Sequence, residues 1–282
     1  MRLTTIHAGY FRLDGGAMFG VVPKRMWNKV NPADDDNLCP WSMRCLLVET
    51  DNRKILIDTG MGDKQGAKFR DHFRPFGDET LKKSLAKAGL KTSDITDVLL
   101  THLHFDHVGG ALEYNQTGEI VPTFENATYW SNEVHYNWAL NPNPREKASF
   151  LKENIVPLME AGVLKFIDVE QDAEWIPGIK IRLLYGHTEA MMMPIIDTGD
   201  RTVVYCCDLM PASYHVPMPW IISYDIRPMK TLEEKTLLLN EALENGYYLY
   251  FEHDPETEMV CLRKNEKGRI VVDKRCVGEN SL

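Results

Sequence analysis

Short apolar runs separated by polar turns occur along much of the chain and predict β-strands. In CLLVETDNRKILIDTGMG, residues 46–48 and 55–57 are apolar and residues 51–52 are polar, so we expect a hairpin there. Further strands are expected at ITDVLLTH, IKIRLLYGH, TVVYCCD and YYLYFEHD. The segment EMVCLRKNEKGRIVVD, near the end of the chain, predicts a closing hairpin.

Segments with helical spacing lie between these strands. In DETLKKSLAKAGLKTSDI, Leu81, Leu85 and Ala88 fall on one helical face. Residues 133–162 are expected to be mostly helical with a proline-containing turn, and TLEEKTLLLNEALENG predicts a helix that ends at Gly246. Strands therefore alternate with helices in both halves of the chain and show no repeat period, which predicts a layered α/β protein.

The composition is that of an ordinary globular protein and narrows the choice of partners. The chain has 282 residues, of which 44% are hydrophobic and 26% charged, and this length fits one large domain or two small ones. A net charge of −9 without a run of Lys or Arg argues against nucleic acid as the main partner. No stretch approaches eighteen apolar residues and the N-terminus has no apolar signal-peptide core, so we expect no membrane segment. The six cysteines form no CxxC pair, and we expect reduced thiols in a cytoplasmic protein.

Candidate chemistry is concentrated in THLHFDHVGG, residues 101–110, which holds three of the nine histidines. In an extended backbone, the side chains of His102 and His104 point to the same side. Asp106 and His107 follow where the glycine pair at 109–110 allows the chain to turn. Imidazole and carboxylate groups suit zinc and the neighbouring divalent metals. The stretch therefore predicts metal binding, with a spacing that differs from the HExxH pattern of a helix.

The run HLHFDH, residues 102–107, resembles the H-x-H-x-D-H signature of the metallo-β-lactamase-fold hydrolases. The rest of that family's pattern follows in order: His187 in LLYGHT, Asp208 in VVYCCD and His253 in YFEHD. Upstream, LIDTG matches the family's strand and turn below the site. The resemblance covers about residues 40–260, and the ligand set as a whole is specific.

The resemblance implies a four-layer αββα sandwich of the metallo-β-lactamase type, formed by residues 1–282 as a single domain. It also implies a site for two divalent metal ions, with Zn²⁺ expected and Mn²⁺ or Fe²⁺ suited to the same ligands. The first metal would be bound by His102, His104 and His187. The second would be bound by Asp106, His107 and His253. Asp208 would bridge the two.

The activity that the resemblance implies is hydrolysis of a small ester, lactone or thioester by a metal-bridging hydroxide. Asp106 and Asp208 would be the catalytic carboxylates, and Asp106 would pass a proton to the leaving group. Asp58 is a candidate acceptor for the second N–H of a ligand histidine, and a role in capping the turn is an equal alternative. The expected partner is a small molecule, with no nucleic acid and no membrane, and the oligomeric state stays open.

Features outside the ligand set look like the lactonase and organophosphate-hydrolase branch, notably FEHDP and the long segment DGGAMFGVVPKRMW. Residues of about 10–40 could form a lid over the active site. There Phe19, Met26 and Trp27 suit an apolar cover over a small substrate, and packing on the core is the equal alternative.

Two positions bear on which branch of the family the chain resembles. Pro211 stands where many acyl-homoserine lactonases have a tyrosine, which Tyr214 could replace, and His215 is a second candidate pocket residue. Zinc β-lactamases of the best-known group have a cysteine in place of Asp208, so a β-lactamase is not expected. Neighbouring Cys207 should point away from the site if the strand stays regular.

The alternative functions are a phosphodiesterase or nuclease, and a non-hydrolytic di-iron member of the same fold. A nuclease needs a basic path for phosphates, which this acidic chain does not show. Di-iron oxidoreductases of this fold usually carry a flavin domain, for which the chain has no length. The other histidines, His7, His72, His135 and His215, have no partner at ligand spacing and are expected to be structural or exposed.

Overall fold

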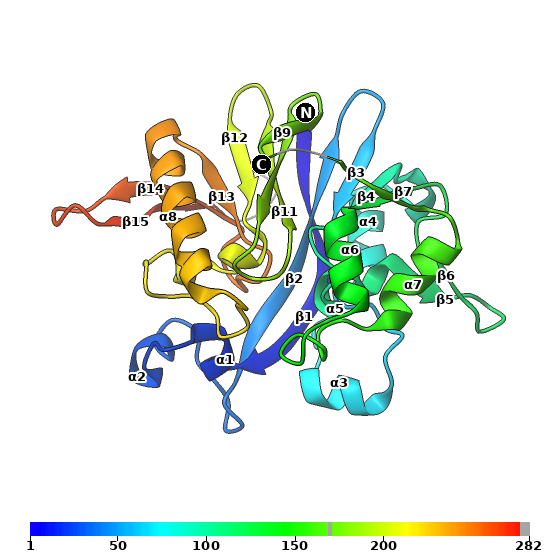
Figure 1. Ribbon diagram of the computed structural model, residues 1–282, viewed down its shortest axis with the longest axis horizontal. Coiled ribbons are helices and arrows are strands. Elements are labelled where there is room, and N and C mark those ends of the chain that lie inside the picture. Colours follow the sequence, from blue (N-terminus) through cyan, green and yellow to red (C-terminus); the bar gives the residue numbers. More distant parts are fainter. Residues whose placement is uncertain (169–170, 277–282) are drawn as a thin grey trace. The chain divides into compact units, whose positions relative to one another are not determined.

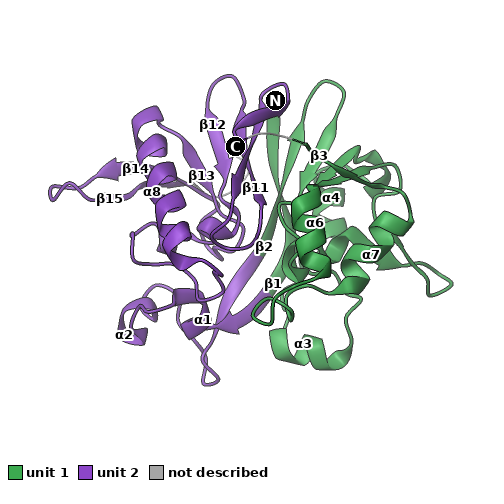
Figure 2. Cartoon of the chain, in the orientation of Figure 1, with its two compact units in different colours: residues 1–10, 43–170, 282 green, residues 11–42, 171–281 purple. Residues whose placement is uncertain are grey.

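The computed structural model describes residues 1–168 and 171–276, and the chain divides into two compact units (Figures 1 and 2). Unit 1 consists of Met1–Tyr10 and Met43–Glu170, and unit 2 consists of Phe11–Ser42 and Gln171–Ser281. Two long strands, β1 (Arg2–Asp14) and β2 (Leu38–Glu49), contribute residues to both units. Each unit combines a β-sheet with helices, as the layered α/β prediction requires.

The sheet of unit 1 has the strand order β1-β2-β3-β4-β7-β8. Its shorter strands are β3 (Lys54–Ile57), β4 (Asp97–Leu99), β7 (Thr128–Ser131) and β8 (Leu164–Phe166). Strands β2 and β3 pair antiparallel, which confirms the predicted hairpin. Strands β3, β4, β7 and β8 pair in parallel, so the residues that follow them lie at one edge of the sheet.

The helices of unit 1 are α3 (Ala67–Phe73), α4 (Leu81–Lys87), α5 (Phe105–Val108), α6 (Glu133–Leu140) and α7 (Lys152–Glu160). A small hairpin, β5 (Leu112–Tyr114) and β6 (Ile120–Pro122), follows α5. Leu85 of α4, Val98 of β4 and Ile155 of α7 are fully buried in one apolar cluster between the helices and the sheet. The predicted helical segments are confirmed, although Ala88 is exposed at the end of α4.

The sheet of unit 2 has the order β15-β14-β13-β12-β11-β10-β9. Its strands are β9 (Ala173–Ile176), β10 (Ile179–Leu184), β11 (Met191–Asp197), β12 (Thr202–Tyr205), β13 (Tyr248–Tyr250), β14 (Met259–Lys264) and β15 (Ile270–Cys276). The helices are α1 (Gly15–Phe19), α2 (Lys24–Trp27) and α8 (Pro228–Asn245).

The direction of these strands places three chain segments at one edge of this sheet. Strands β12 and β13 are parallel, and β10 runs the same way because it is antiparallel to β11, which is antiparallel to β12. The residues that follow β10, β12 and β13 therefore lie at the same edge. Within the described parts of the chain, no helix is long and apolar enough to span a membrane.

Candidate metal centre

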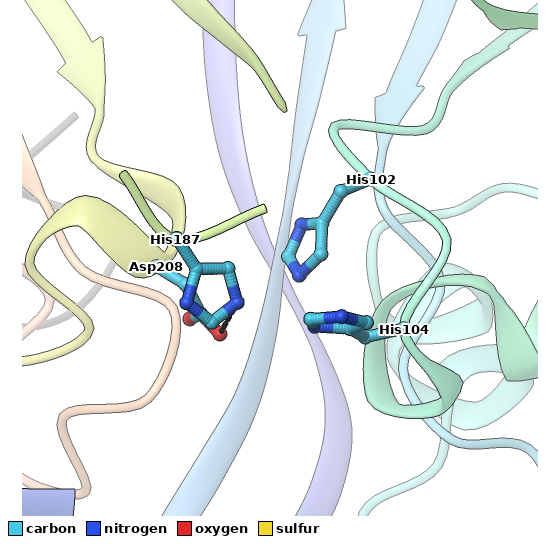
Figure 3. Close-up of side chains that lie close together, drawn as sticks. All are labelled: His102, His104, His187 and Asp208. Atoms are coloured by element: carbon cyan, nitrogen blue, oxygen red, sulfur yellow. Dashed lines mark ion pairs between the residues drawn. The ribbon is translucent and has the colours of Figure 1, made fainter. Parts of the chain in front are cut away.

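In unit 1, the histidine motif starts where β4 ends and reaches into the short helix α5. The rings of His102 and His104 lie with their centroids 4.6 Å apart (Figure 3), and the ring of His107 lies 3.8 Å from that of His102. All three side chains are buried, as is Asp106. The structure therefore brings together the four ligand candidates of this motif.

The carboxylate of Asp58, directly after β3, orients two of these imidazoles. Its Oδ1 accepts a hydrogen bond from the Thr101 amide at 2.8 Å, and its Oδ2 accepts one from the Thr101 hydroxyl at 2.7 Å. The same Oδ2 lies 3.1 Å from Nδ1 of His107, and the Thr101 hydroxyl lies 3.1 Å from Nδ1 of His102. Of the two roles expected for Asp58, the structure therefore shows the one that orients histidines.

Two carboxylates, Asp106 within the motif and Glu146 outside it, lie near these imidazoles. Oδ2 of Asp106 is 3.9 Å from Nε2 of His107, which agrees with a shared metal. Oε1 of Glu146 is 3.7 Å from Nε2 of His104, and only 2% of Glu146 is exposed. Sequence reasoning missed Glu146, which lies in the turn after α6, far from the motif in the chain.

In unit 2, the carboxylate of Asp208 lies between two imidazoles. Its Oδ2 is 3.1 Å from Nε2 of His187, the pair drawn with a dashed line in Figure 3, and its Oδ1 is 3.3 Å from Nε2 of His253. All three residues follow strands that end at the same edge of the sheet. One carboxylate that offers a different oxygen to each histidine is the arrangement that a bridging ligand needs.

The outward nitrogens of these two histidines also have acceptors. Nδ1 of His187 lies 3.1 Å from Oδ1 of Asp225, and Nδ1 of His253 lies 2.7 Å from the carbonyl oxygen of Ser42. Burial lowers the pKa of His187, but the carboxylates of Asp208 and Asp225 outweigh this effect and raise the pKa to about 10. A metal ion bound at Nε2 would therefore have to replace a proton.

The donor set fits divalent metal ions. Four imidazoles turn Nδ1 toward a hydroxyl, a carboxylate or a carbonyl oxygen, which leaves Nε2 as the ligand atom; they belong to His102, His107, His187 and His253. Metal-binding histidines generally donate their second N–H in this way, because it fixes the ring and its tautomer. Buried carboxylates beside neutral imidazoles are the ligands that Zn²⁺, Mn²⁺ and Fe²⁺ accept.

The aromatic residues expected near a lid lie in unit 2. Phe19 is fully buried and stacks on Trp27 at a centroid distance of 5.2 Å and on His215 at 5.3 Å. Nε2 of His215 lies 2.8 Å from the carbonyl oxygen of Met18. Met26 is 49% exposed. The ring stack therefore joins α1 and α2 to the segment that follows Asp208.

Tyr214 and Cys207 are the two other residues considered near Asp208. Tyr214 is buried, and burial raises the pKa of its phenol. The thiol of Cys207 donates to the carbonyl oxygens of Met192 and Tyr205. Strand β12 ends at Tyr205, so the regular strand assumed for Cys207 stops two residues earlier.

Four histidines were expected to be structural or exposed, and of these His215 is fully buried in the ring stack with Phe19. His72 is exposed, His7 is partly buried against Tyr10, and His135 is fully buried.

Known proteins resemble the chain in sequence and in structure. The family model for the Metallo-beta-lactamase superfamily matches residues 44–253. An N-acyl homoserine lactonase of Bacillus cereus is 26% identical over 252 residues, which cover 82% of this chain and 88% of that protein. A probable metallo-hydrolase of Mycobacterium tuberculosis is 26% identical over 244 residues, with 77% and 72% covered. The solved structure of a probable metal-dependent hydrolase from Staphylococcus aureus has a TM-score of 0.87 at 28% identity and covers 99% of this chain and 97% of its own.

Proposed function

Because the chain belongs to the metallo-β-lactamase superfamily and is a metal-dependent hydrolase with that superfamily's fold, we propose that it binds two divalent metal ions and hydrolyses a small ester, lactone or thioester. The family match over residues 44–253 confirms the resemblance and the fold class expected from the sequence. The observation that carries the proposal is the position of Asp208 between His187 and His253.

The proposed site assigns the seven candidate ligands to two ions. The first ion would be held by His102, His104 and His187, the second by Asp106, His107 and His253, and Asp208 would bridge them. The outer acceptors of four of these five histidines support metal binding at Nε2, since their imidazoles are already oriented. Zn²⁺ is the first metal to test, with Mn²⁺ and Fe²⁺ as alternatives, because the ligand types suit all three.

When bound, such a pair of ions activates water at neutral pH and polarises the carbonyl oxygen of the substrate. The protein itself then needs a group that moves a proton to the leaving oxygen. We assign that role to the carboxylate of Asp106, which lies beside the proposed ligand His107. Only 8% of Asp106 is exposed. The chain has no Gly-x-Ser-x-Gly motif, which agrees with hydrolysis without a serine nucleophile.

An aromatic cluster next to the motif supports a substrate with an apolar group. Phe105 lies between the ligands in the sequence, and its ring centroid is 4.4 Å from that of Phe73 and 5.1 Å from that of Phe69. Phe69 and Phe73 are only partly buried. A partly exposed apolar surface of this kind can cover an alkyl or acyl chain. Lactones with an acyl side chain, as in the name of the B. cereus relative, are therefore the first substrates to assay.

A substrate panel tests the reaction. The zinc-loaded protein is assayed with acyl homoserine lactones, simple lactones, aryl esters, thioesters and a phosphodiester. We expect turnover of carbonyl substrates and little turnover of the phosphodiester, since the acidic chain shows no basic run for phosphates. Hydrolysis of the phosphodiester alone would replace the proposal with the phosphodiesterase alternative.

Three further expectations stay proposals. We propose that residues 1–282 act as one domain, with residues of about 10–40 as the lid.

A cytoplasmic location is supported by the absence of a disulfide at Cys39, Cys45, Cys206, Cys207 and Cys261, since reduced cysteines are usual in a reducing compartment. Cell fractionation tests the location. Calorimetry tests the single domain, which predicts one cooperative unfolding transition.

A further inference from the structure

The backbone that carries His102 and His104 belongs to no strand or helix, so its amides need other acceptors. Three acceptors come from three different places in unit 1. The Thr101 amide donates to Asp58 at 2.8 Å, as described above. The Phe105 amide donates to the carbonyl oxygen of Ser149 at 2.9 Å. Between them, the Leu103 amide donates to a side chain, Nε2 of His135, at 2.8 Å.

The sequence places His135 there by local rules. Strands β4 and β7 pair in parallel, so α6, which follows β7, begins beside the end of β4. Asn132 is the N-cap of α6, and its side chain accepts a hydrogen bond from the His135 amide at 2.8 Å. His135 is thereby held in the first turn of the helix, at the level of Leu103.

The side chain of His135 is buried beside the histidine motif. Its side chain is fully buried, and its ring centroid is 6.3 Å from that of His102 and 5.8 Å from that of Phe150. Phe150 also lies against His104, at 4.6 Å. His135 and Phe150 thus pack on the rings of both ligands, while the hydrogen bond holds the peptide between them.

We propose that His135 is a positioning residue for the metal ligands His102 and His104. Its Nε2 accepts a hydrogen bond from the Leu103 amide, and this bond fixes the separation and direction of the two ligand side chains. The proposal rests on the metal site described under the proposed function. An imidazole nitrogen that accepts a hydrogen bond carries no proton, so the ring is neutral with its proton on Nδ1. Without the acceptor, a buried amide would lose its partner, and the chain would shift to satisfy it.

The test compares substitutions at position 135 with a control on the same helix. His135→Leu fills the space with an apolar side chain and removes the acceptor, whereas His135→Asn and His135→Gln offer a carbonyl oxygen. Val134→Ala is the control, since Val134 is 58% exposed.

Zinc affinity is measured by competition with a chromophoric chelator. We expect His135→Leu to weaken zinc binding by about 10- to 100-fold, at least one amide variant to recover part of the loss, and Val134→Ala to bind as the wild type does. A folded His135→Leu protein with wild-type zinc affinity would overturn the proposal.

A second measurement covers the case in which His135→Leu does not fold. Hydrogen exchange of the wild-type protein without metal reports on the Leu103 amide directly. We expect this amide to be protected as strongly as amides of the adjacent strand β4, and exchange at the rate of an exposed amide would contradict the proposal. Because neither readout needs a substrate, a failure of the proposed hydrolysis would not be mistaken for a failure of this inference.

Discussion

The buried carboxylate of Asp225 lies 3.1 Å from Nδ1 of His187, on the side of the ring opposite to Asp208. Burial raises the pKa of Asp225, while its hydrogen bond to His187 opposes this effect. The imidazole is therefore held between two carboxylates, one proposed as a metal ligand and one that orients the ring. We therefore expect Asp225 to affect metal binding although it is not a proposed ligand.

Replacing Asp225 should weaken the metal site without removing a ligand. We expect Asp225→Ala to lower zinc affinity by about 10- to 100-fold, and Asp225→Asn, which keeps an acceptor oxygen, to lower it less. Chelator competition measures both. Glu233→Gln on the exposed face of α8 serves as the control. Equal affinity in wild type and Asp225→Ala would show that His187 is not oriented by this carboxylate.

Replacing Asp208 should have a larger effect, because the proposal makes it a ligand of both ions. We expect Asp208→Ala to lose turnover by orders of magnitude, while His72→Ala, which changes an exposed histidine, keeps turnover within a few fold. Steady-state kinetics with excess Zn²⁺ measures both variants. Similar, mild losses in the two proteins would mean that the bridging role is assigned to the wrong residue.

Metal removal should abolish hydrolysis, since the proposal contains no side-chain nucleophile. We expect a strong chelator to stop turnover and Zn²⁺, Mn²⁺ or Co²⁺ to restore it. Serine- and thiol-directed reagents should have little effect on turnover. Cys207→Ala should keep turnover within a few fold, because this thiol is hydrogen-bonded to backbone carbonyl oxygens. Activity that survives complete removal of metal would refute the mechanism.

His215 should make the stability of the metal-free protein depend on pH. Burial lowers its pKa from 6.5 to about 4, so the unfolded chain binds more protons between these two pH values. The stability that neutral His215 contributes is therefore present above pH 6.5 and is lost as the pH falls to about 4, on the order of 3 kcal/mol in total. We expect the free energy of unfolding of the wild type to fall more steeply over this range than that of His215→Phe, which keeps a ring against Phe19. Parallel curves from denaturant titrations would show that His215 is not buried in its neutral form.

Local sequence patterns predicted the hairpins and helices that have their own periodicity or turn residues. The β2–β3 hairpin, helices α4, α6, α7 and α8, and the closing hairpin β14–β15 each have their own periodicity or turn residues. Strand β1 was missed, because its burial does not alternate regularly and Gly9, with φ of 108°, interrupts it. The ligand candidates were found because they stand at strand ends in a recognisable order.

The residues that orient these ligands could not be found in this way. Asp225 is 38 positions from His187, and His135 is 32 positions from Leu103. Ser42 contributes only a backbone carbonyl oxygen to His253, 211 positions away. Neither residue type nor spacing marks such partners, since they meet only after the strands have paired. Asp58 is the exception, because the turn that carries it is part of the family's pattern.

The number of metal ions per chain tests the central claim most directly. Protein is purified, supplied with Zn²⁺, freed of excess metal and analysed for zinc by elemental analysis. We predict about two zinc ions per chain, since seven candidate ligands exceed what one tetrahedral ion can use. We also predict a lower count in His253→Ala, which removes a ligand of the second ion only. One zinc ion or none per wild-type chain under these conditions would contradict the dinuclear site.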